Sequence, residues 1–320
     1  PPSVRTAASK TVGSELQRLR NAGAISDEEY RNYRKIYADA RHVRGKLSGS
    51  RRVQLGSVIY NLERFAAQGN LTATRAAPLF LTLKRNREWW ANGRMLVYGE
   101  RVSFKGSELI WQFYPGQGIQ LMWLANFGRA NAYWSVKQKD ENLRKLLDEV
   151  LSLAVKRGNG IAWEGYFEFD GGKPGWVSGL WQGTGIQAFA RAGIKLGKGE
   201  PEHVDPVTKK EIRAVPEYLQ ASYRALDIFK RRSPAGVRIP TGNNSAHYLI
   251  YSFYPSLRVL NAFIQSLNGL HDLYELAGYR EALELFNEGD RRARVETPRY
   301  DTGAWSLYSQ YRESDLSYHT

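Results

Sequence analysis

Residues 251–292 read YSFYPSLRVLNAFIQSLNGLHDLYELAGYREALELFNEGDRR, and this stretch decides the fold class. Apolar residues recur every three or four positions over 257–276 and again over 279–292, which is the spacing of one buried helix face. Gly278 separates the two runs, at a place where a helix end favours glycine. The stretch therefore predicts a helical hairpin.

The same helical spacing recurs through the chain. One helix start is well marked, because Ser26 and Glu29 form a capping box, and Ile25 and Tyr30 can form a hydrophobic staple. Pro78 suits the first turn of a later helix. The further predicted helices cover residues 14–23, 26–40, 53–66, 78–90, 117–133, 140–157, 180–192 and 216–231.

Two short segments change to a period of two, which is typical of β-hairpins. One lies over 95–114 with its turn at Lys105-Gly106, and the other over 163–176 with its turn at 170–172. Residues 196–214 predict a surface loop, and 300–320 predict short strands and turns.

No β-α-β alternation appears along the chain. The sequence predicts a mainly α protein, an (α/α) barrel or toroid-like helical domain with small β-hairpin insertions. Its basic N-terminal helical region, 1–92, is expected to pack on a main domain, 93–320.

The charge is concentrated at the N-terminal end. The 320 residues carry a formal charge of +14, and residues 1–105 hold 20 Lys and Arg against 8 Asp and Glu. This distribution suggests an acidic partner, which could be an anionic polysaccharide, a cell-wall polymer or a nucleic acid. A merely solvated basic surface is the alternative. No run approaches 18 apolar residues, so no membrane span is predicted.

Metal and cofactor chemistry find no support in the sequence. There is no cysteine, and the histidines at 42, 203, 247, 271 and 319 include no i,i+4 pair. The chain has no P-loop or dinucleotide fingerprint, and Gly183-Thr184-Gly185 is an isolated G-x-G, for which we predict a packing role inside a helix. We expect no metal and no cofactor.

Aromatic and polar residues crowd two turns, FYPGQG at 113–118 and YDTGAWSLY at 300–308. Aromatic rings stack on the C–H faces of sugars while amide and carboxyl groups bond their hydroxyls, so the composition suits a carbohydrate site. A buried aromatic core near helix ends is the alternative.

Several of these residues resemble a known family. The run YDTGAWSLY at 300–308, followed by SYHT at 317–320, is similar to the end of the C-terminal domain of D-glucuronyl C5-epimerases. Residues 251–272 match that family's Y-x-x-x-P-S-x-x-V-L-N-x-F-x-x-S-L-x-G-L-x-D pattern without a gap. Gln182-Gly183 resembles its A-Q-G helix, and Tyr114-Pro115 its F-Y-P segment. The resemblance covers roughly 110–320.

The resemblance implies an (α/α) barrel-like domain with a cleft, and inversion of C5 of glucuronic acid within a polymer. Its acid/base groups are tyrosines, which fall on Tyr251, Tyr308 and Tyr318. Inversion needs one group to remove the proton next to the carboxylate and another to return a proton on the opposite face. An unperturbed tyrosine, with a pKa of about 10, needs a nearby cation to favour the phenolate. Arg258, Arg312 and Arg129 are candidates.

Further residues are expected to bind the substrate, because they lie at the aromatic turns or within the matching blocks. They are Tyr114, Gln117, Trp163, Glu164, Gln182, Tyr254, Arg258, Asn261, Asp301, Trp305, Arg312 and His319.

The sequence departs from the family in three places. Ile250 precedes Tyr251 where the family has a carboxylate, and Glu164 and Asp315 are the candidates to replace that group. Ten positions separate Tyr308 from Tyr318, fewer than in the family. The chain stops at Thr320 where the family continues with another helix, which suggests a truncated chain. Tyr254, one turn from Tyr251, is the alternative first catalytic group.

Four readings of function follow. The preferred one is an extracytoplasmic or secreted epimerase of a uronic-acid polysaccharide; the location rests on the resemblance and on an N-terminus without Met. A polysaccharide lyase is second, because removal of the same proton begins β-elimination. A non-catalytic glycan-binding or cell-wall-binding module is third, and nucleic-acid binding through the basic helices is the least favoured.

Overall fold

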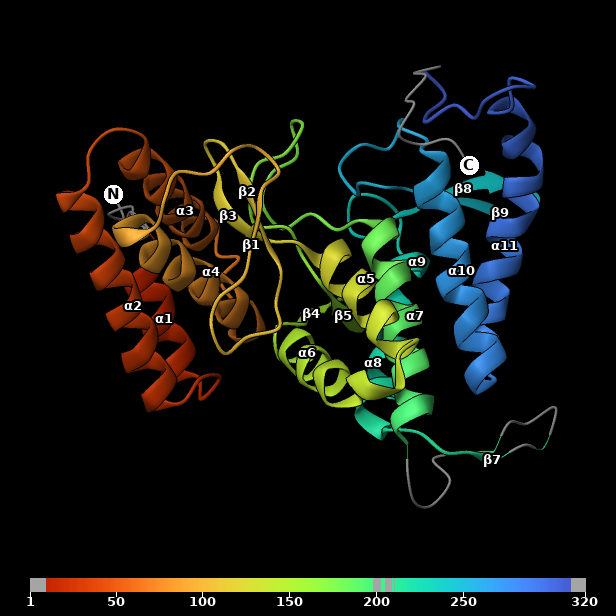
Figure 1. Ribbon diagram of the computed structural model, residues 1–320, viewed down its shortest axis with the longest axis horizontal. Helices are drawn as coiled ribbons and strands as arrows, with labels where there is room; N and C mark the ends of the chain where they lie inside the picture. The colour runs from red at the N-terminus through yellow and green to blue at the C-terminus, as the bar shows by residue number, and fades with distance from the viewer. Residues whose placement is uncertain (1–9, 198–202, 205–208, 210, 312–320) are drawn as a thin grey trace, which may run out of the picture. The chain divides into compact units, whose positions relative to one another are not determined.

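The computed structural model describes residues 10–197, 203–204, 209 and 211–311 (Figure 1). The described chain is mainly helical with small antiparallel sheets, which confirms the predicted class. It divides into two compact units. Within the described residues, unit 1 takes 10–104, 111–121 and 166–169, and unit 2 takes the rest.

Four helices and one sheet build unit 1. The predicted capping box of its second helix is confirmed, since Glu29 N donates to Ser26 Oγ at 3.1 Å and Ser26 N donates to Glu29 Oε2 at 2.8 Å. The elements are α1 (Val12–Asn21), α2 (Asp27–Lys46), α3 (Gly49–Ala67), α4 (Ala73–Asn92), β1 (Arg101–Val102), β2 (Trp111–Tyr114) and β3 (Gly118–Leu121).

Pro78 does not open a helix, so that prediction is wrong. Thr72 caps α4 by accepting a bond from Arg75 N at 3.4 Å, and the helix begins at Ala73. Pro78 therefore lies in the second turn of α4, where it is buried.

The first hairpin forms, but a third strand joins it. Val102 pairs with Trp111, as expected for a turn at Lys105-Gly106. Residues 118–121, predicted as helix, instead pair with β2. The reason lies in α4: Asn86 Oδ1 accepts from Ile119 N at 2.8 Å, and Asn86 Nδ2 donates to Ile119 O at 2.7 Å. This amide holds both backbone groups of Ile119, so the strand is stabilised by a distant helix.

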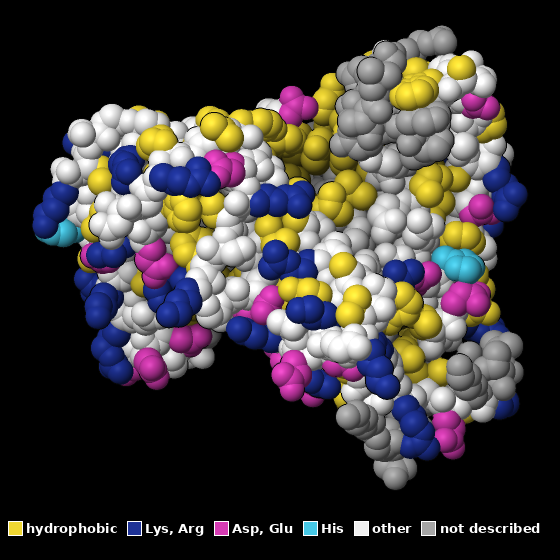
Figure 2. All heavy atoms as spheres, viewed as in Figure 1, with side chains coloured by type: hydrophobic (Ala, Val, Ile, Leu, Met, Phe, Trp, Pro, Cys, Tyr) yellow, Lys and Arg dark blue, Asp and Glu magenta, His cyan; other side chains and the backbone are white. Residues whose placement is uncertain are grey.

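Basic side chains lie exposed on the helices of unit 1. They include Arg34, Arg41, Arg44 and Arg52, and Figure 2 shows Lys and Arg gathered over these helices. Among the described residues, no helix is both long enough and apolar enough to cross a bilayer.

Unit 2 contains the remaining elements. They are α5 (Trp123–Trp134), η1 (Lys137–Lys139), α6 (Asp140–Ser152), β4 (Val155–Arg157), β5 (Gly160–Ala162), α7 (Gly179–Leu196), β6 (His203–Val204), β7 (Glu211–Ile212), α8 (Pro216–Ala225), α9 (Asp227–Lys230), β8 (Arg238–Gly242), β9 (Ser245–Tyr248), α10 (Leu260–Ala277), α11 (Arg280–Glu296) and η2 (Thr297–Arg299).

Two boundaries differ from the prediction. The helix predicted over 140–157 ends at Ser152, because Val155 pairs with Ala162 in the β4–β5 hairpin. The hairpin predicted over 163–176 forms isolated bridge residues around its turn rather than continuous strands, and Gly165 pairs antiparallel with Trp176. A Cβ on Gly165 would lie 2.6 Å from the Trp176 ring, so glycine permits this approach.

Helices α7 and α10 lie side by side and touch through glycine (Figure 1). A Cβ on Gly183 would lie 2.7 Å from Ser266 Cα of α10, and one on Gly185 would lie 2.8 Å from the Phe127 ring of α5. A Cβ on Gly269 would press directly on the carbonyl oxygen of Gly183. The predicted packing role of the G-x-G sequence is confirmed.

Gly269→Ala is expected to lower the free energy of unfolding by about 1–3 kcal/mol, because a rigid backbone faces the added methyl group. Gly128→Ala in α5 is the matched control, since nothing lies within 4 Å of its Cβ. That change should stabilise by roughly 0.5–1 kcal/mol through helix propensity alone. Urea unfolding of both variants measures the difference, and equal effects would contradict the glycine contact.

The predicted hairpin of α10 and α11 forms around Gly278, which has φ of 71° in the left-handed region. Helix α10 begins at Leu260 rather than at Leu257. Leu260 N instead donates to Tyr308 O at 3.1 Å, and Val259 bridges Ser309. The entry to α10 is therefore paired with a segment from the far end of the described chain.

Candidate active site

Tyr251 lies in the connection between β9 and α10, and its backbone is fixed on both sides. Gly179 N donates to Leu249 O at 2.9 Å, and Ser252 N donates to Val177 O at 2.9 Å. Ser252 Oγ also accepts from Val177 N at 3.1 Å. The connection therefore runs against the segment that opens α7.

Aromatic rings surround the Tyr251 side chain, which is partly buried. Its ring stacks on Phe253 at 5.4 Å and meets Trp176 edge-on at 5.6 Å. Trp176 in turn packs on Trp181 at 4.6 Å. Gly172, in the turn of the predicted second hairpin, lies so close to the Phe253 ring that a Cβ there would overlap it. Trp176 and Phe253 were not among the predicted site residues.

Tyr308 reaches the same region through backbone pairing. Gln310 N donates to Arg258 O at 3.3 Å, and Gln310 Oε1 accepts from Arg258 N at 2.7 Å. The preceding turn is closed by Thr302 N donating to Trp305 O at 2.9 Å. Residues 308–310 thus run beside 258–260 and place Tyr308 next to the entry of α10.

Three tyrosines meet on one apolar wall. Tyr251, Tyr254 and Tyr308 all pack against a single buried cluster and remain partly exposed. The members of this cluster are Ile250, Leu257, Val259 and Ala262. Tyrosines distant in the sequence therefore contact one buried cluster of unit 2, and the cluster with these tyrosines is here called the tyrosine wall.

Ile250 belongs to the buried cluster under the tyrosine wall and is 5% exposed. A carboxylate at this position would be removed from water, at a large cost unless it were paired. The packing therefore suits an apolar side chain at residue 250.

Polar groups of the predicted site lie close in sequence to residues of the tyrosine wall. Asn261, in the first turn of α10, has a buried Oδ1 with no hydrogen-bond partner among the described residues. Asp301 is exposed and Trp305 is partly buried in the turn before Tyr308. Arg258 lies in a cavity described below.

Three predicted binding residues lie in the interior of unit 2. Trp163 is buried, with its ring stacked on Phe189 at 5.4 Å. Gln182 is buried and donates to Trp163 O at 3.0 Å. The Glu164 side chain is 0% exposed and accepts from Arg157 at 2.7 Å.

Arg157 ties this carboxylate to two other segments. Its guanidinium also donates to the carbonyl oxygens of Gly175 at 2.6 Å, Ala235 at 2.8 Å and Pro234 at 3.0 Å. In the structure Glu164 therefore anchors loops and does not face solvent.

The remaining predicted residues lie elsewhere. Tyr114 and Gln117 belong to unit 1, where Tyr114 contacts Phe167 at 4.5 Å between ring centroids and Gln117 Oε1 accepts from Glu168 N at 3.0 Å. Arg129 donates to Glu108 O at 2.7 Å. The predicted residues outside the described part of the chain are Arg312, Asp315, Tyr318 and His319.

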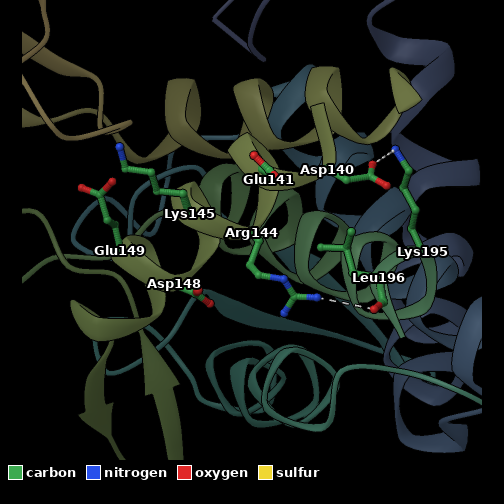
Figure 3. Close-up of a pocket in the computed structure, with 8 residues that line it drawn as sticks. All are labelled: Asp140, Glu141, Arg144, Lys145, Asp148, Glu149, Lys195 and Leu196. Carbon is green, nitrogen blue, oxygen red and sulfur yellow. Dashed lines mark hydrogen bonds and ion pairs between the residues drawn. The ribbon is translucent and has the colours of Figure 1, made fainter. Parts of the chain in front are cut away.

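A different cavity, of about 540 Å³, lies along α6 and the end of α7 (Figure 3). Lys195 there pairs with Asp140 at 2.7 Å, and Arg144 points toward the carbonyl oxygen of Leu196. Four carboxylates face three cations in its lining, which is unfavourable for an acidic polymer. The lining residues are Asp140, Glu141, Arg144, Lys145, Asp148, Glu149, Lys195 and Leu196.

Comparison with known proteins confirms the family resemblance. Residues 212–320 match the family described as D-glucuronyl C5-epimerase C-terminus. A D-glucuronyl C5-epimerase of Caenorhabditis elegans is 34% identical over 148 residues, which is 42% of this chain and 21% of the relative. The match thus spans about a fifth of that relative's length. The family match contains the whole tyrosine wall and leaves unit 1 unmatched.

Proposed function

We propose that this chain inverts C5 of uronic acid residues in a polysaccharide, with Tyr251 and Tyr308 as the two acid/base groups. The observation that carries the proposal is that both tyrosines pack against one buried cluster inside the family-matched region. Tyr318 stays a prediction from the resemblance.

The reaction moves protons only. One tyrosine, as phenolate, takes the C5 hydrogen, and the electron pair of the broken C–H bond passes into the sugar carboxylate as an enediolate. The other tyrosine, as phenol, returns a proton to the opposite face of C5. Atoms and electrons balance without an oxidant, and the two groups exchange protonation states. The positioned tyrosines then control which face of C5 is protonated.

The wider setting of the proposal rests on the family resemblance. We expect an (α/α) barrel or toroid arrangement, a uronic-acid polymer as the partner rather than a nucleic acid, and an extracytoplasmic or secreted location.

Exchange in heavy water tests the chemistry. A non-sulfated polysaccharide of alternating glucuronic acid and N-acetylglucosamine, incubated with the chain in D₂O, is expected to gain deuterium at C5 and a second epimer, both measured by NMR. The same polymer with its carboxyl groups reduced to alcohols should gain none, because its C5 hydrogen is no longer acidified.

Two other results decide against epimerisation. Normal binding of the polymer without deuterium at C5 would exclude this chemistry for that polymer class. New ultraviolet absorbance from an unsaturated sugar would instead identify a lyase.

One observation favours a second function. Ile250 fills the position of the family carboxylate and is buried, which is expected of a module that binds glycan and has lost turnover. Such a module would bind the polymer with equal affinity before and after Tyr308→Phe and show no exchange in either form.

A further inference from the structure

A second cavity of unit 2, of about 450 Å³, is strongly basic. Among the described residues, Arg258, Arg292 and Arg299 line it together with one carboxylate, Glu296. Arg292 and Glu296 lie on α11 and Arg299 on η2, with spacings of four and three residues that place all three on one face. This spacing is the sequence signal that the initial prediction overlooked.

The one carboxylate is already fully engaged. Glu296 Oε2 lies 2.7 Å from His247 Nδ1, and Glu296 Oε1 accepts from Arg292 Nε. Burial lowers the pKa of His247, so the ring is neutral, and Nε2 has no partner among the described residues. Burial tends to raise the pKa of Glu296, but the bonds from His247 and Arg292 outweigh it and lower that pKa. Glu296 therefore pairs directly with one arginine, Arg292, while three arginines line the cavity.

Arg258 and Arg299 pair with no carboxylate among the described residues. Arg258 is part-buried and donates to the carbonyl oxygens of Pro255 at 2.5 Å and Leu257 at 3.4 Å. Burial lowers its pKa. Carbonyl oxygens satisfy hydrogen atoms but do not neutralise the charge. A part-buried cation beside an open cavity favours an anion there.

Neutral donors complete the lining. Tyr300, whose pKa is raised to about 12 mainly by burial, stays protonated and donates to Arg258 O at 3.2 Å. Gln310 donates to Ser256 O at 2.5 Å. These neutral groups bond the surrounding backbone, and the cavity offers guanidinium groups, which match the planar geometry of a carboxylate.

The cavity and the tyrosine wall share their backbone. Arg258 and Gln310 line the cavity, while Leu257, Val259 and Tyr308 belong to the wall. Neighbouring residues of the same two paired segments thus serve both places. An acidic polymer with a sugar at the tyrosine wall has further carboxylates along its chain.

We infer that this basic cavity binds the carboxylate of a second uronic acid residue of the same polymer, next to the sugar at the tyrosine wall. The inference rests on the proposed function for the identity of the polymer. It adds a binding site that holds the chain and takes no part in proton transfer.

The test compares Arg258→Gln and Arg299→Gln with Arg294→Gln. Arg294 is the matched control, because it lies on α11 with its side chain 77% exposed and pairs with Asp290 outside the cavity. A glucuronic acid and N-acetylglucosamine hexasaccharide is titrated by calorimetry. Each cavity variant is expected to bind on the order of tenfold more weakly, and Arg294→Gln to bind as the unchanged chain does. Thermal unfolding checks that the variants are folded, and Arg299→Gln, at an exposed position, keeps the test open if Arg258→Gln does not fold.

Two further ligands show whether the cavity recognises the carboxylates of the polymer or any small anion. The carboxyl-reduced hexasaccharide should bind more weakly to the unchanged chain and equally to all variants. Affinity for inorganic sulfate without affinity for the hexasaccharide would overturn the inference, as would hexasaccharide affinities within twofold across the variants.

Kinetics distinguish this inference from the proposed function. If the chain epimerises, Arg299→Gln should raise KM and leave kcat unchanged. If the chain epimerises and the variants leave KM unchanged, the proposed function holds and the cavity site is wrong. If the chain has no turnover and the cavity variants lose affinity for the hexasaccharide, the cavity site holds and the proposed function is wrong.

Discussion

Tyr308→Phe is expected to reduce epimerisation about 10²–10⁴-fold while the affinity for the hexasaccharide changes little. The ring remains to pack on the tyrosine wall, and only the proton-carrying oxygen is lost. Tyr251→Phe should have an effect of the same size. Initial rates by NMR, with hexasaccharide affinity by calorimetry, separate lost chemistry from lost binding.

The two variants should differ in which epimer still exchanges. With two acid/base groups on opposite faces of C5, each single variant keeps one of them. One variant should still exchange the C5 hydrogen of the glucuronic form for deuterium without inversion. The other variant should do the same with the iduronic form. Loss of exchange from both epimers in either variant would indicate a single shared group and contradict the two-tyrosine assignment.

Two tyrosines serve as controls. Tyr254 packs on the same wall, and Tyr254→Phe is expected to keep turnover. If it collapses while Tyr251→Phe does not, Tyr254 holds the role assigned to Tyr251. Tyr223 is 40% exposed and stacks on Tyr279, so Tyr223→Phe should not affect the reaction.

Glu164→Ala is expected to lower the free energy of unfolding by about 3–5 kcal/mol, because it leaves the Arg157 guanidinium without its counter-charge at 14% exposure. Asp290→Ala is the matched control, since it removes an ion pair whose arginine, Arg294, is 77% exposed. That change should cost less than about 1 kcal/mol. Urea unfolding of both variants measures the difference, and a similar small effect would contradict an anchoring role.

A conservative change separates anchoring from catalysis at the same residue. Glu164→Gln keeps the shape and removes the charge, so an anchoring role predicts lower stability with kcat largely kept in the folded fraction. A fall in kcat with unchanged stability would restore Glu164 as the replacement for the family carboxylate.

Local sequence signals predicted the helices well. The capping box at Ser26 and the left-handed glycine at 278 act within a few residues, so they are visible in the sequence. The strand 118–121 was missed because the amide of Asn86, in a distant helix, holds Ile119. The predicted start of α10 was wrong for a similar reason, since the first residues of the helix bond to the segment that carries Tyr308.

The candidate site was predictable only in part. The family resemblance selected Tyr251 and Tyr308, but no periodicity reveals that segments so far apart become neighbours. Their meeting depends on backbone pairing between residues 258–260 and 308–310. For Glu164 the sequence prediction differed from the structure. A charged residue beside aromatic residues was expected to bind substrate, but its side chain is buried and pairs with Arg157.

The pairing of 258–260 with 308–310 also affects how tightly the protein can bind its substrate. Tyr308 lies on a non-helical segment that main-chain bonds and the Gln310 side chain join to the entry of α10, and such segments open more readily than helices. A sugar bound by both tyrosines would favour the state in which this segment is paired with 258–260. Pairing of the segment and binding of the substrate are therefore thermodynamically linked. The affinity for the polymer is lowered by the free energy that the segment needs to pair.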